Sequence, residues 1–150
     1  MTYNLSAIEN MNTISLPRGG EQQIFFASNA AVPFVNNRYV VGCGTSHTAG
    51  SPTVTLRKTG YYLVNFSGVL SAASTGLVST QLYNNGVAIP GALSSITIDT
   101  AGSLKNVSFS TIVRVLNSCA CIDNTANLTV VNTGLEATYS DAEITIVRLN

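Results

Sequence analysis

The chain has 150 residues, and only 9% of them are charged, against about 25% in a typical soluble protein. Seven basic and seven acidic side chains give a formal net charge of zero. The basic residues are scattered along the sequence, whereas a nucleic-acid binder needs clustered Lys and Arg to displace counterions. No apolar run approaches the ~20 residues that span a bilayer, and the first ten residues lack the pattern of a signal peptide. We therefore expect neither nucleic acid nor a membrane as a partner.

The polar residues are mostly uncharged. Ser, Thr and Asn together make up 48 of the 150 residues, so solubility comes from hydrogen bonding and not from a strong field. A protein with almost no net charge lacks the repulsion that keeps monomers apart. This composition favours a component of an assembly over a free enzyme.

In residues 1–20, apolar side chains recur weakly at every third position, and the segment ends in Pro-Arg-Gly-Gly. The spacing of three permits a short amphipathic helix, while the Asn and Thr content and the Gly-Gly exit fit an extended arm equally well. We interpret 1–20 as an N-terminal attachment arm and 21–150 as the folded domain. The apolar residues that we expect to dock the arm are Leu5, Ile8, Met11 and Ile14.

Short β-rich runs follow the arm and are separated by turns. Asn84-Asn85-Gly86 is a strong hairpin signal, because a type I′ turn needs positive φ at both central positions. No convincing long helix appears, and turns recur every 8–12 residues, which predicts an all-β sandwich. The predicted strands lie at 21–26, 31–35, 38–41, 53–56, 60–70, 77–83, 87–89, 93–100, 106–122, 127–131 and 142–149.

The run 60–70 predicts a central strand that is apolar on both faces. Tyr62, Val64 and Phe66 fall on one face, while Leu63 and Val69 fall on the other. The runs 107–121 and 143–149 show the same property. A two-layer sandwich covers only one face of each sheet, so the second face predicts contact with another subunit.

The order of several short motifs resembles the C1q and tumour-necrosis-factor-like jelly roll, in its bacterial and bacteriophage versions, over about residues 24–150. The resemblance implies a jelly-roll β-sandwich of about ten strands that forms a homotrimer, with runs 60–70, 106–122 and 142–149 at the threefold axis. It then implies a trimer interface that contains Tyr62, Phe66, Phe109, Val113, Val147 and Leu149. The motifs that carry it are Gly60-x-Tyr62, Gln81-Leu82-Tyr83-Asn84-Asn85-Gly86, Ser110-Thr111-Ile112-Val113-Arg114-Val115-Leu116, Leu128-Thr129-Val130-Val131-Asn132 and Ile144-Thr145-Ile146-Val147-Arg148-Leu149.

Side chains that carry chemistry are few. His47 is the single histidine, so a Ser or Cys nucleophile has no second candidate base. Cys119 and Cys121 share one face of a predicted strand, and we interpret them with Cys43 as small buried hydrophobes; the alternative is a metal or redox role. We expect no enzyme activity, no metal and no cofactor. Five carboxylates lie near turns or strand ends, and the alternative is that they pair for acid–base catalysis or bind calcium. They are Asp99, Asp123, Glu136, Asp141 and Glu143.

We therefore predict a non-catalytic structural protein of a bacteriophage virion, a homotrimeric capsid decoration or head-fibre component on the virion surface. Its expected partners are itself and, through the N-terminal arm, the major capsid protein or other virion proteins. The alternative is a receptor-binding or glycan-binding adhesin of a phage or of a bacterial cell or spore surface. In that case a host-surface glycan binds at loops such as 42–52 and 71–76, although these loops lack aromatic side chains for stacking on sugars.

Overall fold

The computed structural model describes residues 8–14, 24–26, 30–32, 34, 36–39, 44–116 and 124–149, and within them the chain forms β-strands without a helix. The predicted all-β class is confirmed. The strands are β1 (Ile8–Ile14), β2 (Ile24–Phe26), β3 (Ala30–Ala31), β4 (Asn36–Tyr39), β5 (Thr45–His47), β6 (Thr53–Leu56), β7 (Gly60–Ser71), β8 (Gly76–Asn84), β9 (Val87–Ile98), β10 (Lys105–Val115), β11 (Ala126–Asn132) and β12 (Ala137–Arg148).

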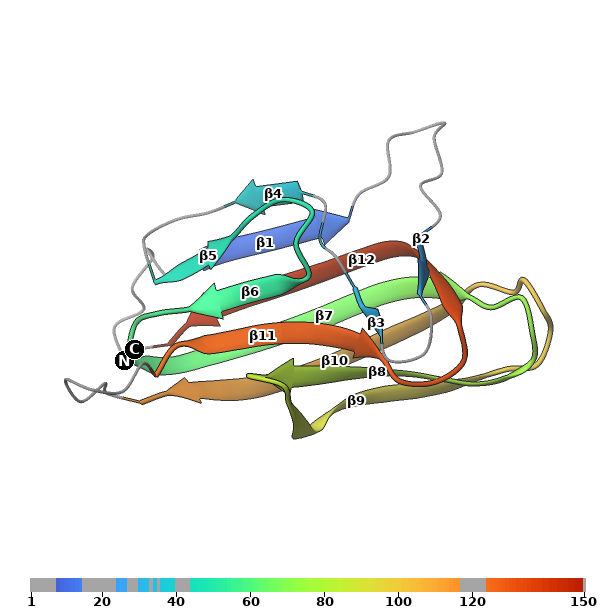
Figure 1. The fold of residues 1–150 in the computed structure, drawn as a ribbon. Helices are drawn as coiled ribbons and strands as arrows, with labels where there is room; N and C mark the ends of the chain where they lie inside the picture. Colours follow the sequence, from blue (N-terminus) through green and yellow to red (C-terminus); the bar gives the residue numbers. More distant parts are fainter. Residues whose placement is uncertain are drawn as a thin grey trace.

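Two six-stranded sheets form the two layers of the sandwich (Figure 1). Sheet A has the order β10-β7-β12-β1-β4, with β2 also paired to β12. Sheet B has the order β5-β6-β11-β8-β9, with β3 also paired to β11. Successive strands such as β6, β7 and β8 alternate between the sheets, and β7 pairs antiparallel with both β10 and β12. This crossing pattern of antiparallel strands is a jelly roll.

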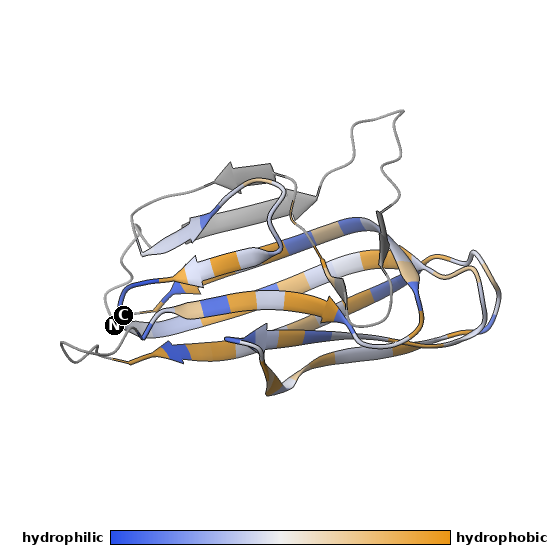
Figure 2. Cartoon of the chain, in the orientation of Figure 1, coloured by the Kyte–Doolittle hydropathy of each residue, from blue (hydrophilic) through white to orange (hydrophobic). Residues whose placement is uncertain are grey.

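Strand β7 is central, as its sequence predicts. Its side chains alternate strictly, with Tyr62, Val64 and Phe66 buried while Tyr61 and Asn65 are exposed. Figure 2 shows the same alternation of apolar and polar residues along the other long strands. One parity of each strand therefore faces the second sheet, and the other parity faces away from it.

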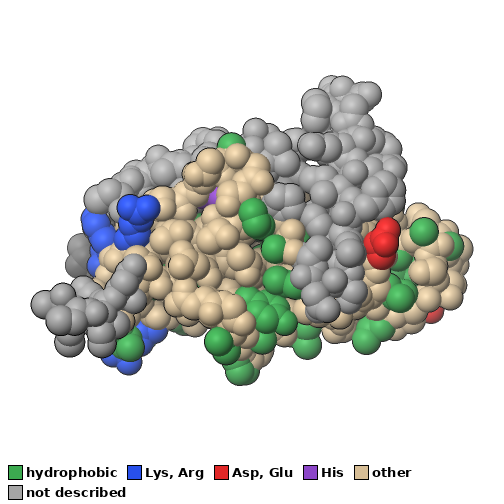
Figure 3. Space-filling view, in the orientation of Figure 1, with side chains coloured by type: hydrophobic (Ala, Val, Ile, Leu, Met, Phe, Trp, Pro, Cys, Tyr) green, Lys and Arg blue, Asp and Glu red, His purple; other side chains and the backbone are tan. Residues whose placement is uncertain are grey.

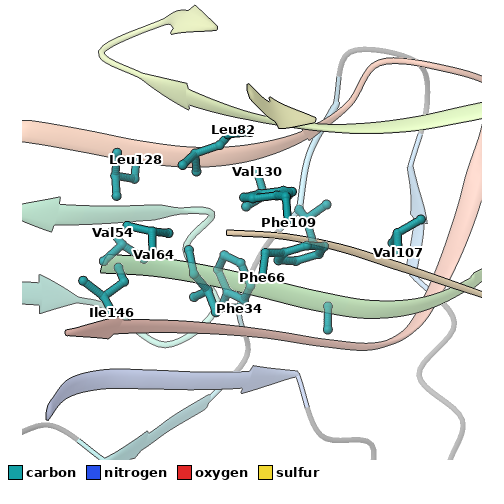
Figure 4. Close-up of a cluster of buried hydrophobic side chains, with 14 of the residues drawn as sticks. Phe34, Val54, Val64, Phe66, Leu82, Val107, Phe109, Leu128, Val130 and Ile146 are labelled. Carbon is teal, nitrogen blue, oxygen red and sulfur yellow. The ribbon is translucent and has the colours of Figure 1, made fainter. Parts of the chain in front are cut away.

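The core lies between the two sheets (Figure 4). Phe66 of β7 and Phe109 of β10 stack there with ring centroids 5.2 Å apart and an interplanar angle of 21°. Burial of each such ring contributes about 1.5–3 kcal/mol relative to exposure. The largest fully buried side chains come from both sheets and are Tyr62, Tyr139, Phe34, Phe66, Leu56, Leu70, Leu82, Ile98, Leu128, Ile144 and Ile146.

The hairpin between β8 and β9 is the predicted one. Asn85 has φ +49° and Gly86 has φ +80°, which are the two positive values that a type I′ turn requires. Strand β9 continues through Pro90 and Gly91, where the sequence predicted a break. Pro is tolerated because β9 is an edge strand, and Gly91 takes φ +84° beside a register shift.

The N-terminal segment differs from the expected arm. Residues 8–14 form β1, which pairs antiparallel with β12 on one side and β4 on the other. Ile8 stands opposite Val147, and Ile14 stands opposite Ala142. This part of 1–20 is thus a strand of sheet A, whereas Leu5 lies outside the described residues. The pattern missed the strand because β1 contains a register shift between Glu9 and Met11, which breaks the period of two.

Candidate functional site

The residues predicted for a trimer interface divide into two groups. Tyr62, Phe66, Phe109 and Val113 are at most 8% exposed in the single chain and belong to the core between the sheets. The hydroxyl of Tyr62 also donates to the carbonyl oxygen of Lys58 at 2.6 Å. Their assignment to the interface is therefore corrected: they stabilise the fold of one subunit. Val147 and Leu149 are half-buried, and their place in an interface stays a prediction.

An apolar row crosses the outer face of sheet A, the face turned away from sheet B. Leu63 of β7 stands opposite Ile112 of β10 on one side and Val147 of β12 on the other. Ile112 is 56% exposed, and the other two are half-buried. We call Ile112, Leu63 and Val147 the apolar row. The row is therefore open to solvent at Ile112 and partly covered at Leu63 and Val147.

Sequence reasoning missed this row because both parities of 60–70 are apolar. A signal was present, however. Leu63 shares its parity with the exposed Asn65 and Ser67, and Ile112 shares its parity with the exposed Ser108 and Ser110. Polar neighbours on the same parity mark that face as the outer one. The Ser110 hydroxyl donates to Asn65 Oδ1 at 2.6 Å, so these neighbours form a bonded polar strip beside the row.

One long edge of the sandwich is open. Strands β9 and β10 end their respective sheets and lie next to each other, and the Ser108 N–H of β10 donates to Ser94 Oγ of β9 at 3.3 Å. Leu93 of β9 is half exposed on this edge strand. Unpaired strand edges with apolar side chains are surfaces on which a second chain readily packs.

Charge is separated along the sandwich. Arg57, Lys58, Arg114 and Arg148 lie where β7 begins and where β10 and β12 end, and we call this region the basic end. The opposite end carries Asp99, Glu136 and Asp141 together with Lys105. Figure 3 shows Lys and Arg gathered at one end of the visible face and acidic side chains toward the other.

The described surface has several hollows, and three of them contain charged side chains that bear on function. A hollow of about 340 Å³ on the outer face of sheet A contains Asp141 and Glu143. A hydroxyl-rich hollow of about 300 Å³ lies over β5 and β6 and contains His47 and Arg57. A third, of about 210 Å³, contains Arg114 and several amide side chains. The second and third both lie at the basic end.

The described residues contain no cluster suited to metal binding. His47 Nε2 lies 2.8 Å from the Ser51 carbonyl oxygen, to which only a protonated nitrogen can donate, and its ring meets Phe34 edge-on at 6.2 Å. No group of three His, Cys, Asp or Glu side chains converges among the described residues, while Cys43, Cys119 and Cys121 lie outside them. No helix that spans a membrane occurs in the described part of the chain.

Solved structures share this fold over almost the whole chain. An Eiger TNF from S. frugiperda aligns with a TM-score of 0.68 at 12% identity, covering 96% of this chain and 94% of that one. The PRD1 vertex protein P5 aligns with a TM-score of 0.57 at 14% identity, covering 96% and 99%. Murine APRIL aligns with a TM-score of 0.58 at 12% identity, covering 85% and 98%. The chain has the C1q/TNF-like jelly-roll fold, as its sequence predicted.

At the level of sequence there is no corresponding match. No protein-family model matches the chain, and no curated protein sequence matches it. The likeness therefore concerns the fold, and function must be argued from the surfaces described above.

Proposed function

We propose that this chain is a non-catalytic structural protein of a bacteriophage virion, a homotrimeric capsid decoration or head-fibre component exposed on the particle surface. The observation that carries the proposal is the likeness to the PRD1 vertex protein P5, which extends over 96% of this chain and 99% of that one. The low charge and the high Ser, Thr and Asn content suit a part of an assembly.

A second copy of this chain is the partner that best fits the apolar row. The open edge formed by β9 and β10 offers the exposed Leu93, and the row of one copy packs against that edge in the next copy. A contact between two different surfaces is heterologous, and three copies close it into a ring. Such packing covers both the unpaired strand edge and the exposed apolar side chains.

The residues before Gly20 contact the particle in this proposal, through Leu5, Ile8, Met11 and Ile14. Strand β1 joins this segment to sheet A by its pairing with β12. The partner is the major capsid protein or another virion protein. Immunogold labelling of native particles should place this chain on the virion surface, and its absence from purified particles would overturn the virion role.

Trimer formation is tested by the molar mass in solution. Light scattering after size-exclusion chromatography should give about three times the 15.7 kDa of one chain. Ile112→Asp should reduce this mass, because it introduces a charge into the apolar row, which the proposed trimer buries. Leu77→Asp is the matched control, since Leu77 is 54% exposed but belongs to sheet B. A monomeric parent protein, or equal masses for the two variants, would contradict the interface.

The non-catalytic character rests on the sparse reactive side chains among the described residues. Neither a chelator nor a reductant should change the thermal midpoint, because loss of a structural metal or disulfide typically costs several kcal/mol. A large drop with the chelator alone would point to calcium at the carboxylates. A drop with the reductant alone would point to a disulfide between Cys43 and Cys119 or Cys121.

A further inference from the structure

The turn between β8 and β9 carries the single Asn-Gly pair of the sequence, Asn85-Gly86. Both residues are exposed, and both have positive φ, at +49° and +80°. An asparagine before glycine is prone to deamidation, because glycine has no side chain to hinder its backbone nitrogen and its backbone rotates easily. The pair is therefore a candidate site of chemical modification, and the fold decides whether the reaction proceeds.

Deamidation of this pair needs only the turn itself and water. The Gly86 backbone nitrogen attacks Cγ of Asn85, so a C–N bond forms and the Gly86 nitrogen gives up its proton. The bond from Cγ to Nδ2 breaks, and Nδ2 leaves as ammonia with that proton. Water then opens the succinimide ring at either of its carbonyl carbons, which leaves aspartate or isoaspartate at position 85. Neither an oxidant nor a reductant takes part.

The folded hairpin holds the Asn85 amide in a state that opposes this reaction. Nδ2 donates to the Thr125 carbonyl oxygen at 3.1 Å, and Oδ1 accepts from the Asn127 N–H at 2.9 Å. Attack at Cγ makes the planar amide carbon tetrahedral, which draws both polar atoms away from these partners. Because both hydrogen bonds must be given up before the ring closes, they slow the reaction in the folded chain.

The backbone of the turn is held as well. The Asn85 N–H donates to the Asn127 carbonyl oxygen at 2.9 Å, and Asn84 pairs with Val87 across the turn. A planar succinimide ring fixes the rotation about the Cα–C bond of residue 85 at a value that a type I′ turn does not have. Ring closure therefore requires the hairpin end to leave both its type I′ geometry and its contact with β11.

Either product fits the docked hairpin less well than Asn85 does. Aspartate has an oxygen in place of Nδ2, so an anionic acceptor faces the Thr125 carbonyl oxygen and the donor between them is lost. Isoaspartate routes the backbone through Cβ, which lengthens the two-residue turn and disturbs the pairing of Asn84 with Val87. A hairpin that has opened and reacted is therefore hindered from docking on β11 again.

We propose that Asn85 is a deamidation site that the docked hairpin protects and that local opening of the hairpin exposes. The hairpin is then a one-way switch: it opens and closes reversibly while the amide is present, and it stays detached from β11 once the amide is lost. The segment that it releases is the start of β9, an edge strand of sheet B. The proposal concerns the single chain and does not depend on the structural role.

Peptide mapping by mass spectrometry tests the protection in the full chain. Folded protein and protein unfolded in guanidinium chloride are incubated at the same neutral pH and temperature. The unfolded chain should gain aspartate and isoaspartate at position 85, and the folded chain should do so at least about tenfold more slowly. Asn106 is the internal control: it is exposed, but the branched Val107 follows it, so it should react far more slowly in both samples. Equal rates at position 85, no reaction there in the unfolded chain, or an equally fast reaction at Asn106 overturns the proposal.

Chemical unfolding of aged protein tests the consequence. The form that carries isoaspartate at position 85, separated by ion exchange, should unfold at a lower denaturant concentration than fresh protein. Asn85→Gly is the matched control, because glycine takes the positive φ of the turn but has no amide to lose. This variant lacks the side-chain bonds to Thr125 and Asn127, so it should begin less stable than the parent and should not change on ageing. An unchanged midpoint for the isoaspartate form, or an equal decline of Asn85→Gly with age, overturns the proposal.

Discussion

The hydroxyl oxygens of Tyr139 and Thr80 lie 2.6 Å apart and form a hydrogen bond between the two sheets. Tyr139 belongs to β12 of sheet A and Thr80 to β8 of sheet B, and both side chains are fully buried. A buried polar pair is tolerated in this mainly apolar core because each hydroxyl has a partner. This hydrogen bond also fixes the position of β12 relative to β8 across the core.

Removal of either partner should destabilise the protein. Tyr139→Phe and Thr80→Val each leave one buried hydroxyl without this bond, at a cost of about 1–3 kcal/mol. The double variant should lose less than the sum of the two, because neither hydroxyl is then stranded. Urea unfolding at a fixed protein concentration measures the three free energies. Strict additivity would show that the bond contributes nothing.

Alkaline pH should weaken the fold through the same tyrosine. Burial raises the pKa of Tyr139 to about 12, from its ordinary value of 10.0, and the hydrogen bond with Thr80 lowers it only in part. The phenol therefore ionises first in the unfolded chain, so its stabilising effect is complete below pH 10 and is lost between pH 10 and 12. The loss amounts to about 2–3 kcal/mol. Tyr139→Phe should show a smaller alkaline loss than the parent when both are unfolded with urea across this pH range.

The sequence predicted the fold well where alternation and turn chemistry agree. The strand 60–70 and the Asn84–Gly86 hairpin lie within one or two residues of β7 and the β8–β9 turn, and the predicted strand 142–149 falls on β12, which begins five residues earlier at Ala137. Each has a period of two together with a turn signal that depends only on local backbone geometry. The long-range pairing of β7 with β10 and β12 came from the family resemblance, since no local pattern specifies it.

The candidate site was predicted less well, because its residues depend on which parity faces solvent. Tyr62 and Phe109 are larger than Leu63 and Ile112, so their parity buries more surface when it packs in the core. The hollow that contains Arg114 joins residues about forty positions apart, such as Asn85 and Thr125, through hydrogen bonds of a hairpin turn. No sequence pattern predicts that these residues lie close together. Only the assembled sandwich brings the groups together.

The Phe66 and Phe109 stack should matter for folding and not for assembly. Phe109→Ala should cost about 3–5 kcal/mol, because it removes a buried ring and leaves a cavity beside Phe66. The folded fraction should keep the molar mass of the parent. Ile112→Ser on the same strand should show the reverse, with a small change in stability of the subunit and a reduced mass. If folded Phe109→Ala had a lower molar mass than the parent, Phe109 would have to be part of the interface.

Gly134 should be intolerant of any side chain. A Cβ at this position would lie 2.6 Å from both the Leu77 carbonyl oxygen and the Ser79 nitrogen of β8, and backbone atoms in a strand cannot move aside cheaply. Gly134→Ala should therefore cost about 3 kcal/mol or more. Gly102→Ala is the matched control: Gly102 has φ +79° and open space around it, so only strain of about 1–2 kcal/mol applies. Equal unfolding free energies for the two variants would contradict the packing of 134 against β8.

Two deletions separate attachment from folding in the N-terminal segment. Removal of residues 2–7 leaves β1 complete, and this variant should unfold at the same midpoint as the parent. Removal of residues 1–20, with a new initiator methionine, takes away β1, so the edge of β12 is opened and β4 loses its partner in sheet A. Each lost backbone hydrogen bond contributes about 0.5–1.5 kcal/mol, and the total loss should exceed about 3 kcal/mol.

Thermal unfolding measures both midpoints, and cosedimentation with particles measures attachment, which the longer deletion should abolish. If the chain that starts at Glu21 kept the parent midpoint and lost only attachment, residues 1–20 would be an arm outside the folded domain, and β1 would contribute nothing to the stability of sheet A.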